Sequence, residues 1–193
     1  MRELSLHILD LIENSIRAGA SIIAVTVIEN ASENLLQISV EDNGPGLSVG
    51  PTQATDPFYT TKDGRRTGLG LSLFRAASEE AQGSLSIGKS SLGGAAITAV
   101  MQLNHIDRKP IGDLAATLSS VVCTNPDLDL WCRFASGDNE WMLRVSDVAK
   151  EYCVTDRCGL VMARRVSEKI KTGLASIYGA RHVGYGRNVL QHE

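Results

Sequence analysis

Asp42-Asn43-Gly44-Pro45-Gly46-Leu47 is the stretch on which the interpretation of the whole sequence depends. It follows the apolar run at residues 35–40, which has the character of a strand, and it leaves an acidic side chain at a strand end beside glycines. An aspartate there can accept a hydrogen bond from an amino group, and the glycines let the main chain approach a flat ligand. The same residue types also form ordinary turns, so this stretch alone leaves both a turn and a binding site open.

The preceding segment, residues 2–17, is predicted to be an amphipathic helix. Its buried stripe recurs at helical spacing and consists of Leu4, Ile8, Leu11, Ile12 and Ile16. Its polar line, on another face, consists of His7, Asp10, Asn14 and Arg17. Such a face is often merely solvated. A carboxylate, an amide and a guanidinium on one line can nevertheless supply a proton acceptor, a metal ligand and a phosphate clamp.

The following segments alternate between strand and helix patterns. Residues 21–28 and 35–40 indicate a hairpin, residues 71–81 a helix, and residues 83–90 and 95–103 two further strands. Residues 56–70 form no regular element but contain hydroxyls, cations and glycines. Free backbone amides there, just before a helix, predict an anion site.

Residues 83–90, GSLSIGKS, match the phosphate-loop pattern GxxxxGK[ST]. That loop requires a strand before it and a helix after it, whereas this segment follows a helix, alternates as a strand itself and leads to another strand. We therefore interpret the match as coincidental.

Composition limits the classes of protein that fit. The 193 residues are 43% hydrophobic and 21% charged with a formal charge of -3, which is typical of a soluble globular chain of one domain or two small ones. No apolar run is long enough to cross a membrane, so we expect a cytoplasmic protein. The absence of a basic cluster leaves nucleic-acid binding unsupported.

Four cysteines, Cys123, Cys132, Cys153 and Cys158, lie in the last part of the chain and form no CxxC pair. We expect reduced thiols, while the proximity of Cys153 and Cys158 keeps a redox or iron–sulfur role open.

Together, these segments resemble the GHKL ATPase superfamily, which groups gyrase, MutL, the sensor histidine kinases and the anti-sigma-factor kinases. The first helix resembles the N box, the Asp42 stretch the G1 box, residues 56–62 the F box, residues 68–72 the G2 box and residues 93–96 the last glycine signature. The resemblance covers residues 2 to about 103. It implies an α+β fold, a two-layer α/β sandwich in which helices cover a mixed sheet.

The resemblance also implies roles for individual residues. Asp42 would accept the adenine amino group beside Gly44 and Gly46, Asn14 would coordinate Mg²⁺, and Arg17 would contact phosphate. Residues 58–70 would form a lid over ATP. Its contacts would come from Phe58, Thr60, Thr61, Lys62, Gly68, Leu69, Gly70 and Leu71.

Two departures bear on the subtype. Asp10 stands where several members carry a catalytic glutamate, so we expect it to act as the base or as a second Mg²⁺ ligand. The N box begins almost at the first residue, which leaves no room in this sequence for a phosphoacceptor hairpin. We therefore expect His7 and His105 to be structural or solvent-facing.

The predicted organisation is an ATP-binding domain at residues 1–106, a small α/β module at 107–178 and a flexible tail at 179–193. The module is expected to contain a helix at 113–122, strands at 128–134 and 140–145, and a helix at 160–177. Trp131 and Trp141 are expected to be cross-strand neighbours in its core. Packing and partner binding both remain open as roles for it.

The functional prediction is a regulatory ATP-binding protein that acts as a kinase or ATPase on an unidentified protein partner, of the anti-sigma serine kinase or orphan histidine-kinase type. The alternative is a non-catalytic module whose lid closes on ATP and changes a protein contact. ATP and Mg²⁺ are the expected ligands, and a homodimer is possible on either interpretation.

Overall fold

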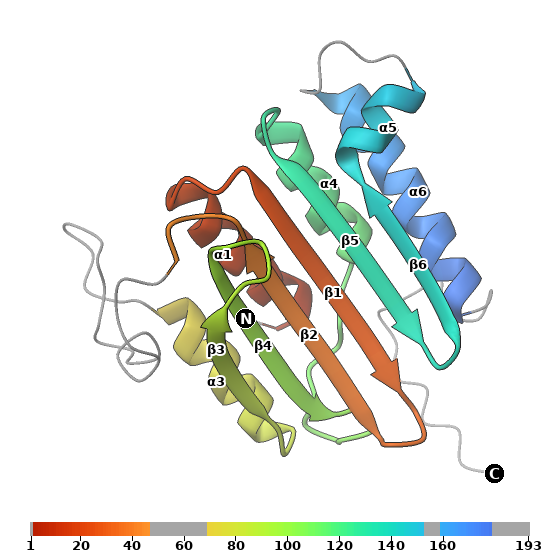
Figure 1. The fold of residues 1–193 in the computed structure, drawn as a ribbon. Helices are drawn as coiled ribbons and strands as arrows, with labels where there is room; N and C mark the ends of the chain where they lie inside the picture. The colour runs from red at the N-terminus through yellow and green to blue at the C-terminus, as the bar shows by residue number, and fades with distance from the viewer. Residues whose placement is uncertain (1, 47–68, 153–158, 179–193) are drawn as a thin grey trace.

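The computed structural model describes residues 2–46, 69–152 and 159–178. Its centre is a six-stranded sheet in the order β3-β4-β2-β1-β5-β6 (Figure 1). The strands are β1 Ile22–Asn30, β2 Leu35–Asp42, β3 Ser84–Lys89, β4 Ala95–Gln102, β5 Asp129–Ser136 and β6 Asn139–Arg144. All neighbours pair antiparallel except β1 and β5, which are parallel, so the sheet is mixed as predicted.

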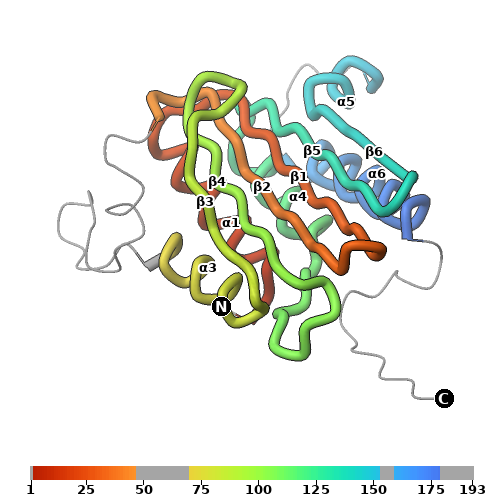
Figure 2. The backbone as a smooth tube through the Cα atoms, turned by 60° about the horizontal axis from the view of Figure 1, so that its bottom comes forward, coloured from red at the N-terminus to blue at the C-terminus, as the bar shows by residue number. Residues whose placement is uncertain are grey.

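The helices cover one face of this sheet and leave the other uncovered by any described helix (Figures 1 and 2). They are α1 Leu4–Arg17, α3 Leu69–Glu80, α4 Leu114–Thr124, α5 Val145–Glu151 and α6 Leu160–Tyr178. Helices α3, α1, α4 and α6 contact one another in that order across the sheet. The predicted α+β two-layer sandwich is therefore confirmed.

A single hydrophobic cluster joins the two layers. In the apolar stripe of α1, Leu4, Ile8 and Ile12 are fully buried in one cluster with alternate residues of the central strands, such as Val25 and Ile38. Burying a side chain of this size stabilises the fold by about 1.5–3 kcal/mol. The stripe therefore fixes which face of α1 meets the sheet and which face remains for polar side chains.

The C-terminal elements extend the same sheet. Strand β5 runs parallel to β1 over eight paired positions, from Ile22↔Asp129 to Glu29↔Ser136, and α4 packs on both α1 and α6. Leu118 and Phe134 are fully buried in the cluster that also contains Leu4. Residues 114–152 and 159–178 thus share a sheet and a core with the N-terminal part, and the domain boundary near residue 106 stays a prediction.

Two expectations for this part were wrong. Helix α5 occupies Val145–Glu151, where no helix was expected after the strand. Trp131 and Trp141 lie on opposite faces of the sheet, because Trp131 pairs with Arg144 and Trp141 with Phe134. Arg144 stacks on Trp131 at 4.1 Å, whereas Trp141 stacks on Phe134 on the covered face.

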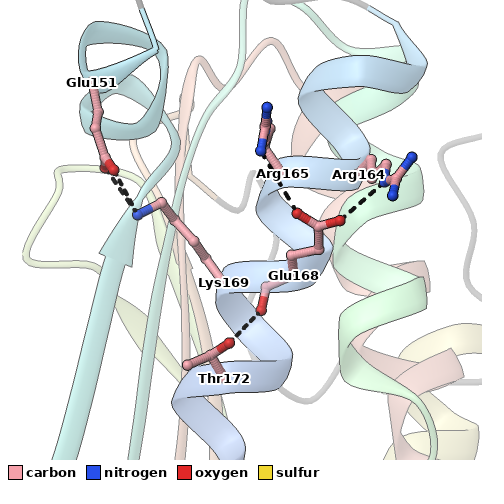
Figure 3. A network of polar contacts seen from close by, with 6 residues as sticks. All are labelled: Glu151, Arg164, Arg165, Glu168, Lys169 and Thr172. Carbon is pink, nitrogen blue, oxygen red and sulfur yellow. Dashed lines mark hydrogen bonds and ion pairs between the residues drawn. The ribbon is translucent and has the colours of Figure 1, made fainter.

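Surface ion pairs connect α5 to α6 and run along α6 (Figure 3). Lys169 pairs with Glu151 at 2.9 Å, and Glu168 pairs with Arg164 at 3.0 Å and with Arg165 at 3.9 Å. Exposed pairs of this kind contribute at most about 1 kcal/mol each. They orient α5 on α6 but do not determine the fold.

The GxxxxGK[ST] match at residues 83–90 is coincidental, as expected. Residues 84–89 form β3 and pair with β4 from Ser84↔Val100 to Lys89↔Ala95, and a turn rather than a helix follows. A Cβ on Gly83 would lie 1.8 Å from the carbonyl oxygen of Val100, so this glycine is required for strand packing.

Candidate functional site

Asp42 ends β2 with its carboxylate buried and held by three donors. Ser15 Oγ donates to Oδ2 at 2.6 Å, while the backbone N–H groups of Gly44 and Ala95 donate to Oδ1 at 2.9 and 3.1 Å. The side chain is only 5% exposed. A carboxylate has about four acceptor positions. The described residues therefore fill three of them and leave one on Oδ2.

Glycines make this arrangement possible. A Cβ on Gly94 would lie 2.1 Å from Asp42 Oδ1, and the Gly94 N–H donates to the Asp42 carbonyl at 3.0 Å. Gly46 has a φ of 78°, in the left-handed region that side chains with a Cβ disfavour. The chain thus passes tightly around the Asp42 carboxylate on two sides.

Asn43 fixes the start of the loop after Asp42. Its Oδ1 accepts from the backbone N–H groups of Ser21 and Ile22, both at 2.9 Å, and its Nδ2 donates to Ser21 Oγ. These bonds attach the loop to the beginning of β1. The Asp42 stretch is therefore both a structured turn and a polar cradle.

Asp10, Asn14 and Arg17 form a continuous polar line on α1, whereas His7, which was expected to belong to it, is buried against Phe74. Asn14 Nδ2 donates to Asp10 Oδ2 at 3.1 Å, and the Arg17 guanidinium donates to Asn14 Oδ1. Arg17 also pairs with Glu13 at 3.6 Å. The line therefore presents a carboxylate, an amide and a cation next to one another.

The first turn of α3 lies directly against this polar line. A Cβ on Gly70 would fall 1.7 Å from Asp10 Oδ2, so a larger residue would displace the Asp10 carboxylate from this position. The N-terminal end of a helix carries free N–H groups and partial positive charge. The contact therefore brings an anion-attracting helix end beside Asp10 and Asn14.

Helix α1 connects the two halves of the site through consecutive residues. Asn14 belongs to the polar line, and Ser15 bonds to the Asp42 carboxylate. An acceptor for an amino group and a polar line facing a helix N-terminus are thus linked rigidly. This combination suits a ligand with a flat amino-bearing ring at one end and an anionic group at the other.

Other predicted site residues lie outside the described residues. These are Phe58, Thr60, Thr61, Lys62 and Gly68. Leu69 begins α3, and its side chain is likewise not described. Leu71 packs its side chain against the hydrophobic cluster, so only its backbone is available for a ligand.

Ser15 and Gly94 are contacts of Asp42 that the sequence interpretation missed. Ser15 follows Asn14 in the sequence, and Gly94 belongs to the glycine pair Gly93-Gly94. Neither position indicated a contact to Asp42. The one feature of the sequence that could have pointed to Ser15 is that a serine interrupts the apolar surface of α1.

His7 is structural, which is one of the two roles expected for it; it is not solvent-facing. It is 1% exposed and stacks on Phe74 of α3 with ring centroids 5.1 Å apart. Neither ring nitrogen has a hydrogen-bond partner among the described residues. Burial, aided by the positive charge of Lys109, lowers the pKa of His7 to about 4.

The described residues contain neither a membrane-spanning helix nor a metal-binding cluster. Within residues 2–46, 69–152 and 159–178, no helix is long and apolar enough to cross a membrane. Over the same residues, no cluster of three or more His, Cys, Asp or Glu side chains could hold a metal ion. A cation at this site would therefore need ligands besides such a cluster.

Comparison with known proteins gives one family match. The family described as histidine kinase-, DNA gyrase B- and HSP90-like ATPase matches residues 2–105. No curated protein sequence matches the chain.

Several solved structures are similar to it. The ATP-binding domain of PrrB from Mycobacterium tuberculosis is 23% identical over 50% of this chain and 64% of that one, with a TM-score of 0.40. The N-terminal domain of a DNA repair protein is 12% identical over 93% and 58%, with a TM-score of 0.48. The Aquifex aeolicus MutL ATPase domain complexed with ADP is 13% identical over 79% and 70%, with a TM-score of 0.40.

Proposed function

The chain belongs to the histidine kinase-, DNA gyrase B- and HSP90-like ATPase family, and from that premise we propose that it is an ATP- and Mg²⁺-dependent kinase or ATPase acting on a protein partner. Residues 2–105 are an ATP-binding domain of the type that this family shares. The observation that carries the proposal is the buried Asp42 carboxylate with one open acceptor position, joined through α1 to a polar line at a helix N-terminus.

Adenine recognition is assigned to Asp42. Its Oδ2 would accept the exocyclic amino group, because Ser15 fills only one acceptor position of that oxygen. The glycines beside it let the main chain close around the carboxylate, because a Cβ on Gly94 would lie 2.1 Å from Oδ1 and one on Gly44 would lie 3.2 Å from it.

The phosphate end is assigned to the polar line of α1 and the N-terminus of α3. The oxygens of Asn14 and Asp10 are hard ligands of the kind that Mg²⁺ prefers, and Mg²⁺ in nucleotide sites commonly uses one or two protein ligands together with the phosphates. The donor set therefore fits the ion. Mg²⁺ bound there would neutralise charge that develops on the phosphates.

Asp10 is the proposed general base. Asn14 Nδ2 holds its carboxylate at 3.1 Å, and the backbone at Gly70 lies against it. From this position Asp10 would take the proton of an attacking hydroxyl, either of water or of the partner. That oxygen forms the new bond to the γ-phosphorus as the bond to ADP breaks.

A second candidate function is a nucleotide-responsive module without turnover. The observation that favours it is the bond from Arg17 to Asn14 Oδ1, because Mg²⁺ bound to that oxygen would repel the Arg17 guanidinium. Nucleotide binding would then rearrange an exposed cation on α1 and change a protein contact.

Substitution of Asp10 distinguishes the two candidates. Asp10→Asn should leave the affinity for Mg²⁺-ATP within about tenfold of wild type and reduce ADP release at least about 100-fold, as expected for loss of a general base. Asp147→Asn, an exposed carboxylate on α5, is the matched control and should leave both quantities unchanged. Equal turnover by wild type and Asp10→Asn would exclude Asp10 as the base, and no turnover by wild type would favour the module.

A further inference from the structure

We infer that Ser15 is a positioning residue that orients the Asp42 carboxylate and thereby sets a preference for adenine over 6-oxopurine nucleotides. The inference rests on the proposed ATP site. It adds a residue that touches Asp42 rather than the nucleotide and gives that residue a measurable effect on base selectivity.

The Ser15–Asp42 bond has the geometry of a strong interaction. The 2.6 Å separation of Ser15 Oγ and Asp42 Oδ2 lies in the range of hydrogen bonds from a hydroxyl to an ionised oxygen. Both side chains are 5% exposed, so water competes little for either group. The bond connects α1 directly to the end of β2.

The other carboxylate oxygen is held independently. Oδ1 accepts from the N–H groups of Gly44 and Ala95, and the Gly94 backbone packs against it. Because a carboxylate is planar, these contacts and the Ser15 bond together fix the orientation of the whole group. With Ser15 in place, the described residues leave Oδ2 a single open acceptor position in one direction.

This single position discriminates between purines by donor and acceptor chemistry. Adenine carries an amino donor at ring position 6, whereas hypoxanthine and guanine carry a carbonyl acceptor there. An ionised carboxylate can only accept, so a 6-oxopurine would place an acceptor against Oδ2. A site left with an unmatched buried polar group rejects the wrong ligand strongly.

Loss of the Ser15 hydroxyl should relax this selection. Two acceptor positions of Oδ2 would then be open, and the one that Ser15 had filled could accept from the ring N–H that hypoxanthine carries next to its carbonyl. ATP would lose an oriented acceptor, while ITP would gain an accessible one. The ratio of the two affinities should therefore change even if the fold does not.

Calorimetric titration of the full chain with ATP and with ITP, each with Mg²⁺, tests the inference. Ser15→Ala should weaken ATP binding and lower the ATP-over-ITP affinity ratio by about tenfold, the size expected from loss of a hydrogen bond to a charged group. Ser15→Thr, which keeps a hydroxyl, should retain most of the ratio. Ser5→Ala, a buried serine on the same helix whose hydroxyl bonds to Glu3, should match wild type.

The outcomes separate this inference from the proposed function. A Ser15→Ala protein that binds ATP and ITP in the wild-type ratio would overturn the positioning role, even if both affinities fall together. Asp42→Asn, titrated in parallel, addresses the ATP site itself. If ATP affinity survives Asp42→Asn, the proposed site fails and the inference fails with it.

Discussion

His7 connects α1 to α3, and replacing it should remove an acid-sensitive part of the stability of the fold. Its ring stacks on Phe74, so it holds together the two helices that carry Asp10 and Gly70. The ring is 1% exposed and its nitrogens have no described partner. Protonation would therefore place an unpaired charge between the helices, which is unfavourable.

The magnitude follows from the difference in pKa between the two states. Burial first, and then the charge of Lys109, lowers the pKa of folded His7 from 6.5 to about 4, while Glu80 acts in the opposite direction. As the pH falls below 6.5, the unfolded chain takes up the proton first, so the stability from neutral His7 is lost between about pH 6.5 and pH 4. The complete loss is about 3 kcal/mol, of which about 2 kcal/mol has gone by pH 5.

Urea unfolding at pH 7 and pH 5 measures this effect. His7→Phe keeps a flat ring on Phe74, and His7→Gln keeps a polar side chain that does not titrate. Between pH 7 and pH 5, the wild type should lose about 2 kcal/mol more free energy of unfolding than either variant. Equal losses in the wild type and both variants would refute the reasoning.

Two further predictions concern packing around the site and in the C-terminal half. Gly70→Ala should weaken Mg²⁺-ATP binding at least about tenfold in a calorimetric titration, because its Cβ would fall 1.7 Å from Asp10 Oδ2. Gly88→Ala is the control and should bind Mg²⁺-ATP as the wild type does, because a Cβ there meets nothing within 4 Å. Equal binding by the two variants would contradict the close approach. Trp141→Ala should lower the free energy of unfolding by about 3–5 kcal/mol and Trp131→Ala by clearly less, because of the two only Trp141 lies on the covered face of the sheet. Similar losses for the two variants in urea unfolding would contradict the placement of the two tryptophans on opposite faces.

Individual helices and strands could be predicted from the sequence because the spacing of their apolar residues repeats within a few positions. Helix α1 was expected at residues 2–17 and occupies Leu4–Arg17, and β2 was expected at residues 35–40 and extends to Asp42. The apolar stripe sets the buried face of α1, so the polar line followed directly. Asp42 could be singled out because a strand end followed by glycines is visible within a few residues.

The position of the C-terminal half could not be predicted in the same way. The parallel pairing of β5 with β1 joins residues about 107 apart, as in Ile22↔Asp129, and no local pattern specifies it. The face of each tryptophan depends on the hairpin register. Ser136 pairs with Asn139, and this register places Trp131 opposite Arg144 rather than Trp141.

Ser15 could not be recognised as part of the site for a related reason. A serine on a helix is an ordinary residue until the partner of its hydroxyl is known, and that partner is 27 residues away. The same holds for Gly94, whose lack of a side chain matters only because Asp42 lies 2.1 Å from where a Cβ would be. Contacts between distant segments decide both roles.

The affinity of Asp42→Asn for Mg²⁺-ATP is the most direct test of the central claim. An amide in place of the carboxylate either turns its NH₂ group toward the adenine amino group or turns it toward the N–H groups of Gly44 and Ala95 and loses those bonds, so calorimetry should show binding at least about tenfold weaker than wild type. Asp138→Asn, in the exposed turn after β5, is the control and should bind as wild type. A folded Asp42→Asn protein with unchanged ATP affinity would contradict the claim that this carboxylate reads the base.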